Sequence, residues 1–97
     1  MTQSPPETES SLDLQRRRLR FRAWHRGTKE ADLMIGGFAD RHLEGMDADG
    51  LHWFERLLVE DDVDIMGWAL GRQDVPPALQ HPLVARLQAL DYIGTAR

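Results

Sequence analysis

Arg26-Gly27-Thr28-Lys29-Glu30 separates two stretches of different character and decides where the first two helices meet. Before it, the basic and aromatic segment Arg16 to Trp24 combines good helix formers with a loose apolar stripe. After it, apolar residues recur at spacings of three and four from Ala31 to Leu43, which predicts an amphipathic helix. We therefore expect a first helix over Ser11 to Trp24, a turn at the glycine, and a second helix.

Capping and breaking residues divide the rest of the chain. Ser11 or Asp13 is expected to cap the first helix, and Gly45 to end the second. Asp47 is a favourable cap for a third helix that stops near Glu60. The acidic run Asp61 to Asp64 begins a short fourth helix, which Gly71 closes.

A proline-containing loop, Asp74 to Pro77, precedes the last expected helix. That helix starts at Pro82 after a possible His81 cap and ends at Gly94. Because no window alternates with a period of two, the pattern predicts an all-α protein, a compact five-helix bundle. Residues 1–12 are polar and are expected to form a disordered tail, which leaves residues 13–97 as a single helical domain.

The composition narrows the possible functions. A chain of 97 residues supports only a thin core, so a large enclosed active site is not expected and neither is an enzyme. The absence of cysteine removes thiolate metal sites and thiol nucleophiles. No apolar run suits a signal peptide or a membrane span, so we expect a cytoplasmic protein without membrane insertion.

The polar residues do not form a recognisable metal or nucleotide site. The four histidines lie on different expected elements, without the spacing of a metal site. Gly36 and Gly37 lack the strand and lysine of a phosphate-binding loop. Inside a helix, each of these glycines lowers helix stability by roughly 1 kcal/mol relative to alanine. We expect that they allow close packing against another helix; a kink in the helix is the alternative reason.

The basic segment Arg16 to Trp24 leaves a second function open. Arginines interleaved with Phe21 and Trp24 could pair phosphates and stack bases, as in a small helical nucleic-acid-binding module. The formal net charge of −4 and the lack of a known reading helix argue against this alternative. A salt-titrated DNA-binding assay would test it.

The central stretch also has a purely structural interpretation. Gly27 could cap the second helix, and Glu30 could reach back to its amide while favouring the positive end of the helix. Arg26 is not explained in this way, because an arginine four residues before a glutamate is the poorer order for a helical ion pair. A partner carboxylate or an anionic ligand would suit this guanidinium better.

The run from Arg18 to Leu33 resembles the Arg-Gly-x-x-Glu signature of the FAD assembly factors that promote flavinylation of succinate dehydrogenase. Leu57 to Asp64 and Trp68 are similar to a second block of the same family, so the resemblance covers roughly Arg16 to Leu90. Val63 departs from the pattern, because the family commonly has proline there. The departure alters a helix start and leaves the motif intact.

The resemblance implies a five-helix assembly chaperone that binds the flavoprotein subunit of succinate dehydrogenase, or fumarate reductase, in a bacterial cytoplasm. The FAD would belong to the partner, with none bound stably by this chain, which we expect to be a monomer that binds no nucleic acid and no metal. Arg26, Gly27 and Glu30 match the motif, and His25 and Asp32 flank it. These five residues are the expected partner contacts.

Overall fold

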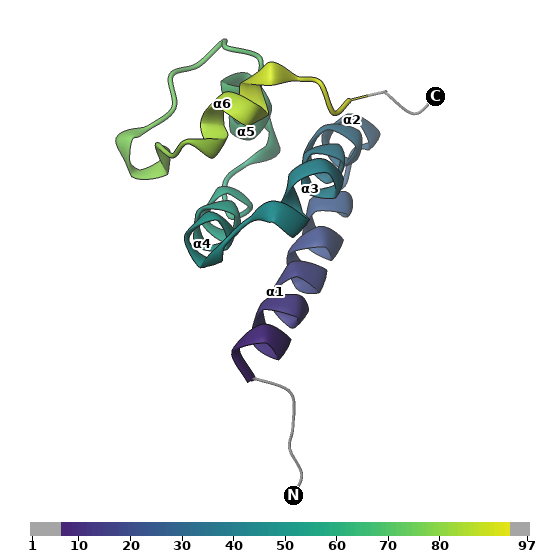
Figure 1. Ribbon diagram of the computed structural model, residues 1–97. Coiled ribbons are helices and arrows are strands. Elements are labelled where there is room, and N and C mark those ends of the chain that lie inside the picture. Colours follow the sequence, from purple (N-terminus) through teal and green to yellow (C-terminus); the bar gives the residue numbers. More distant parts are fainter. Residues whose placement is uncertain (1–6, 94–97) are drawn as a thin grey trace, which may run out of the picture.

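The computed structural model describes residues 7–93, which fold into a helical bundle (Figure 1). The second helix is continuous but changes its winding, and two 3₁₀ turns connect other elements. The elements are α1 (Glu7–Trp24), then α2 (Lys29–Ala31), the π-helical η1 (Asp32–Gly36) and α3 (Gly37–His42) in one run, the 3₁₀ turn η2 (Leu43–Gly45), α4 (Ala48–Leu57), α5 (Asp62–Ala69), the 3₁₀ turn η3 (Pro77–Leu79) and α6 (Leu83–Ala89). Since residues 7–93 contain no strand, the prediction of an all-α, five-helix protein is confirmed.

Several capping predictions are confirmed. Asp47 accepts a hydrogen bond from the Gly50 amide at 2.9 Å at the start of α4. Gly71 follows α5 with a φ of +74°, a left-handed conformation that glycine adopts without steric cost. At the last helix, Pro82 holds the N-cap position, one residue before the first helical position predicted for it, although the Leu83 amide does donate a hydrogen bond to His81 Nδ1 at 3.1 Å.

The outer boundaries differ from expectation. The first helix begins at Glu7, so Ser11 and Asp13 lie inside it and do not cap it, and residues 1–6 of the expected tail lie outside the described residues. The last helix ends at Ala89, because Leu90 adopts a left-handed conformation with a φ of 57°. Gly94, the expected end, lies outside the described residues.

Close packing explains why two glycines are tolerated in the second helix. A Cβ atom on Gly36 would overlap the indole ring of Trp24, so the glycine lets α1 and η1 approach each other. A Cβ atom on Gly37 would lie 2.8 Å from the Tyr92 carbonyl oxygen, where the end of the described chain crosses α3. The expectation of close packing is confirmed, and the π-helical winding at Asp32–Gly36 accompanies it.

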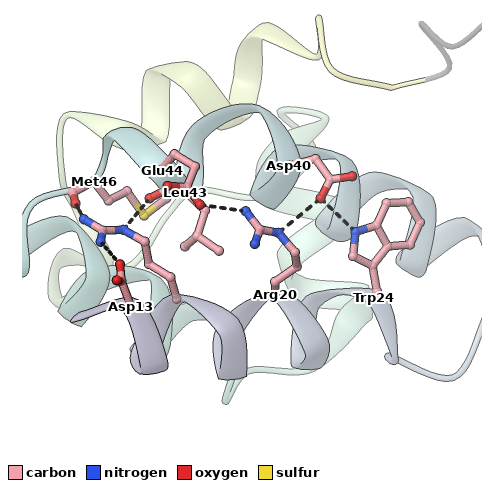
Figure 2. Close-up of polar contacts among 8 residues, drawn as sticks. Asp13, Arg20, Trp24, Asp40, Leu43, Glu44 and Met46 are labelled. Atoms are coloured by element: carbon pink, nitrogen blue, oxygen red, sulfur yellow. Dashed lines mark hydrogen bonds and ion pairs between the residues drawn. The ribbon is translucent and has the colours of Figure 1, made fainter. Parts of the chain in front are cut away.

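A row of polar contacts joins α1 to the second helix and to η2 (Figure 2). Arg16 donates to the carbonyl oxygens of Leu43 at 3.3 Å and Met46 at 2.9 Å. Arg20 pairs with Asp40 at 3.5 Å and with Glu44 at 3.3 Å. Asp40 also accepts a hydrogen bond from Trp24 Nε1 at 3.1 Å. Two of the arginines of the basic segment are therefore engaged within the fold.

Aromatic and aliphatic side chains from every helix form the core. Phe38 and Phe54 are fully buried, with ring centroids 5.7 Å apart, and they join α3 to α4. Trp53 and Trp68 are each 4% exposed, and Trp53 Nε1 donates to the Leu79 carbonyl oxygen at 2.8 Å. This core holds the bundle together behind the loop between α1 and α2.

Candidate functional site

The loop from His25 to Thr28 turns the chain between α1 and α2 at one end of the bundle (Figure 1). Gly27 has a φ of +116°, and no atom lies within 4 Å of the position that its Cβ atom would take. Glycine is favoured here by its backbone conformation, because residues with a Cβ atom rarely adopt such a φ. The loop thus exposes the backbone of one residue, Gly27, without a side chain over it.

Thr28, not Gly27, caps the second helix. Its backbone is extended, and its Oγ1 accepts a hydrogen bond from the Ala31 amide at 3.2 Å. Threonine supplies the side-chain acceptor that glycine lacks. The predicted capping role of Gly27 is therefore wrong. The helix begins one residue later than a cap at Gly27 would place it. Glu30 becomes the second helical residue, with an exposed side chain, while Ala31 takes the position from which a side chain reaches back to the cap.

Arg26 binds within the chain, although its guanidinium was expected to reach a partner. Its side chain is 12% exposed, and its Nε donates to Asp62 Oδ1 at 2.7 Å. Its Nη1 and Nη2 atoms donate to the carbonyl oxygens of Leu58 at 2.8 Å and Glu60 at 2.9 Å. Leu58 and Glu60 belong to the turn between α4 and α5, and Asp62 is the first residue of α5. The planar guanidinium can bind all of them at once, which a lysine ammonium could not do in the same geometry.

Asp32 holds the loop from the opposite side. Its Oδ1 accepts a hydrogen bond from the backbone amide of Arg26 at 2.6 Å. The backbone of Arg26 is thus attached to the second helix and its side chain to the α4–α5 turn. We call Arg26, Asp32 and Asp62 the loop clamp. It fixes the entry to Gly27 through charge-assisted hydrogen bonds, which are stronger than neutral ones.

His25 covers the α1 side of the loop. Its imidazole ring stacks on Phe21 with centroids 3.9 Å apart and an angle of 20° between the planes. Its Nδ1 lies 2.6 Å from the Phe21 carbonyl oxygen, where it can donate a hydrogen bond. Both side chains are exposed, and Phe21 is 62% accessible. His25 therefore extends an exposed aromatic surface from α1 to the loop.

The five predicted contact residues divide into two groups. His25, Gly27 and Glu30 are exposed at the loop, whereas Arg26 and Asp32 are half-buried and hold it in place. An open groove of about 550 Å³ runs along the loop, between Trp24 and Leu33, with Lys29 at its edge. Its open shape suits it to contact with the surface of another molecule.

Asp62 and Phe21 were not among the predicted site residues. Asp62 lies 36 positions after its partner Arg26, and the sequence presents it only as part of a capping run. Its place in the second block of the resemblance was the one signal that linked it to the motif. Phe21 was visible as an aromatic residue among arginines, and the structure brings it against His25.

Comparison with known proteins identifies the family. The model of the family described as "Flavinator of succinate dehydrogenase" matches residues 17–91, which include the loop clamp and Gly27. The chain belongs to this family. Residues 17–91 also contain nearly all of the described helical bundle, so family membership applies to the fold and to the loop together.

Individual relatives agree with this membership. A FAD assembly factor, SdhE, from Acetobacter pasteurianus is 39% identical over 79 residues, which cover 81% of this chain and 72% of the relative. The mitochondrial succinate dehydrogenase assembly factor 2 of Debaryomyces hansenii is 40% identical over 70 residues, 72% of this chain and 49% of the relative. The assembly factor 2 of Saccharomyces cerevisiae is 40% identical over 62 residues, which cover 64% of this chain and 38% of the relative. This chain thus spans about half or less of these mitochondrial relatives.

Two further expectations from the sequence concern nucleic-acid binding and membrane insertion. Neither the family description nor the relatives' names support the nucleic-acid alternative, and Arg16 and Arg20 of that segment bind inside the fold. In the part of the chain that the structure describes, no helix has the length and apolar character needed to cross a bilayer.

Proposed function

We propose that this protein binds the flavoprotein subunit of succinate dehydrogenase and promotes the covalent attachment of FAD to it. Family membership supports this role, as does the name of the bacterial relative that shares most of its length with this chain. The observation that carries the proposal is the exposed Gly27 backbone held rigidly by the loop clamp. A rigid, side-chain-free segment lets the backbone of another protein approach closely.

In this proposal the protein is a helper and not an enzyme. The covalent chemistry belongs to the partner and its flavin, and the helper supplies orientation, which can account for a large part of a rate enhancement. Gly27 would lie against the partner backbone, and Glu30 and His25 would make polar contacts beside it. Arg26 and Asp32 would act by holding the loop in position. The same role extends to the flavoprotein subunit of fumarate reductase.

The setting of this activity is part of the same proposal. We place the protein in the bacterial cytoplasm as a monomer that binds the flavoprotein subunit there. The bacterial relative is the basis for this setting. Gel filtration of the purified chain, alone and with the flavoprotein subunit, would show a single copy in each case.

The decisive experiment expresses the Gly27→Arg variant in a strain that lacks the native factor. A Cβ atom at this position would meet no neighbour within 4 Å, so the arginine adds bulk to the exposed side of the loop, at the backbone cost of a side chain at a φ of +116°. We expect loss of covalent flavin on the flavoprotein, seen as loss of in-gel flavin fluorescence. Normal flavin incorporation by this variant would contradict the proposed role of the loop.

Gly71→Arg is the matched control. Gly71 also has a positive φ, at 74°, and also has no neighbour within 4 Å of its would-be Cβ atom. Both substitutions place a side chain at a positive φ, at a cost on the order of 1–2 kcal/mol for Gly71, which lies near the left-handed helical region, and at a larger cost for Gly27, whose φ of +116° lies outside it. We expect Gly71→Arg to support normal flavinylation, and thermal melting of both variants followed by circular dichroism shows whether a loss with Gly27→Arg reflects the loop or general destabilisation.

A further inference from the structure

The outer face of α1 carries apolar side chains where a surface helix normally carries polar ones. Leu14 is 44% exposed and Phe21 is 62% exposed, and a spacing of seven places them on the same side of the helix. Leu19 and Ala23, at 2% and 0% exposure, face the core from the opposite side. The two exposed residues lie outside the core, and their exposed apolar area is available to a partner.

Arginines border this apolar strip. Arg17 and Arg18 are exposed and Arg22 is half-buried, and none of the three forms an ion pair within the described part of the chain. Arg16 and Arg20, in contrast, point toward η2 and α3 and are engaged there (Figure 2). We call Leu14, Arg17, Arg18, Phe21 and Arg22 the α1 face. It combines exposed apolar area with three available positive charges.

The α1 face is continuous with the loop. The stacked Phe21 and His25 rings join the strip to the residues around Gly27. A partner that lies against the loop would therefore extend over α1 without crossing a polar gap. Aromatic and arginine side chains are the residues that most often dominate the binding energy of a protein interface.

We propose that the α1 face binds an apolar segment of the flavoprotein subunit that is flanked by carboxylates. This inference rests on the proposed function and adds a second contact to it. Carboxylates of the partner would pair with Arg17, Arg18 and Arg22, while its apolar side chains would cover Leu14 and Phe21. The α1 face provides affinity and an attractive field, whereas the loop positions the partner.

Charge around the α1 face favours a protein partner over a polyphosphate or an anionic lipid surface. Exposed Asp13 lies one residue before Leu14, and Glu55 of α4 lines a groove together with Arg18 and Arg22. A continuous phosphate array would meet these carboxylates as well as the arginines. A protein segment can place single carboxylates opposite the arginines and apolar atoms between them.

Affinity measurements on the full chain and the purified flavoprotein subunit test this proposal. For Phe21→Ala, we expect at least a tenfold rise in Kd at both low and high salt, because an apolar contact is lost. The double variant Arg17→Glu, Arg18→Glu should raise Kd by at least tenfold at low salt and should flatten the salt dependence. Circular dichroism should show an unchanged helical signal, since all three side chains are exposed.

Matched controls lie on other surfaces. Leu70→Ala removes a side chain that is 38% exposed at the end of α5, and Arg72→Glu with Arg86→Glu reverses two exposed charges away from α1. Both controls should bind within twofold of the wild-type Kd. Equal losses in the controls and in the α1-face variants would overturn the proposal.

The outcomes separate this proposal from the function on which it rests. If the wild-type chain restores covalent flavin and the α1-face variants bind as tightly as wild type, the α1 face is not a docking surface and the proposed function stands. If the wild-type chain neither binds the subunit nor restores flavin, both proposals fall. Binding of duplex DNA or phosphatidylserine vesicles that the α1-face variants abolish, with unchanged affinity for the subunit, would assign the face to phosphate instead.

Discussion

Arg26 Nε lies 2.7 Å from Asp62 Oδ1, and this ion pair joins the loop before the second helix to the first residue of α5. Both side chains are largely shielded, at 12% and 24% exposure. The same guanidinium binds the carbonyl oxygens of Leu58 and Glu60. The most recognisable arginine of the sequence therefore connects two distant segments of its own chain.

Replacing Arg26→Ala should lower the free energy of unfolding by about 2–3 kcal/mol, because it leaves one carboxylate and two carbonyl groups without their donor. Arg26→Lys should lower it by less, since one charge remains but three acceptors cannot be reached together. Urea denaturation followed by circular dichroism measures both. Unchanged stability of Arg26→Ala would show that the turn finds other partners.

Gly36→Ala should destabilise the protein by about 1–3 kcal/mol, because the added methyl group overlaps the Trp24 indole and forces a rearrangement. Thermal melting would measure the loss. Gly45→Ala is the control, since no atom lies within 4 Å of its would-be Cβ atom and its φ is not positive. It should leave stability unchanged or raise it by up to about 1 kcal/mol. Similar melting of both variants would argue against close contact between α1 and η1.

His42 should make the protein less stable in mild acid. Burial, as the main cause, lowers the pKa of His42 below its ordinary value of 6.5, while nearby Asp91 opposes this shift and Arg41 and Arg86 add to it. Its Nε2 atom has no hydrogen-bond partner among the described residues. Because the unfolded chain binds the proton more readily, the stability is present above pH 6.5 and is lost as the pH falls through the lowered pKa.

Urea denaturation at a series of pH values from 8 down to 5 would show this loss. His42→Leu should reduce the dependence on pH, whereas His52→Gln, at an exposed position of α4, should keep it. A profile that is identical in wild type and His42→Leu would exclude His42 as the source.

Tyr92 should resist titration until the protein unfolds. Burial raises the pKa of Tyr92 far above its ordinary value of 10.0, and its hydroxyl donates a hydrogen bond to the Leu87 carbonyl oxygen. In alkali the unfolded chain loses this proton first, so the stability present below pH 10 declines as the pH rises further. Since Tyr92 is the single tyrosine of the chain, ultraviolet absorbance reports it directly. An ordinary titration near pH 10 in the folded state would contradict this placement.

Local patterns in the sequence were sufficient for most of the helical architecture. The three- and four-residue apolar spacing, the Asp47 cap and the Gly71 terminator depend on residues close together in the chain, and each takes its predicted place. The same local reasoning misplaced the cap of the second helix. Glycine and threonine are both acceptable residue types at an N-cap. Thr28 takes that position because its backbone is extended, whereas Gly27 has a φ of +116°.

The sequence by itself determined an all-α protein with a glycine-centred loop and a recognisable family motif. Only the tertiary structure decided how the motif is used. Arg26 finds its acceptors 32 to 36 positions away, and Trp24 meets Gly36 across two helices. Such contacts depend on how the helices pack, which local periodicity does not specify. Packing buries the guanidinium of Arg26 and leaves the Gly27 backbone and the Phe21 ring exposed.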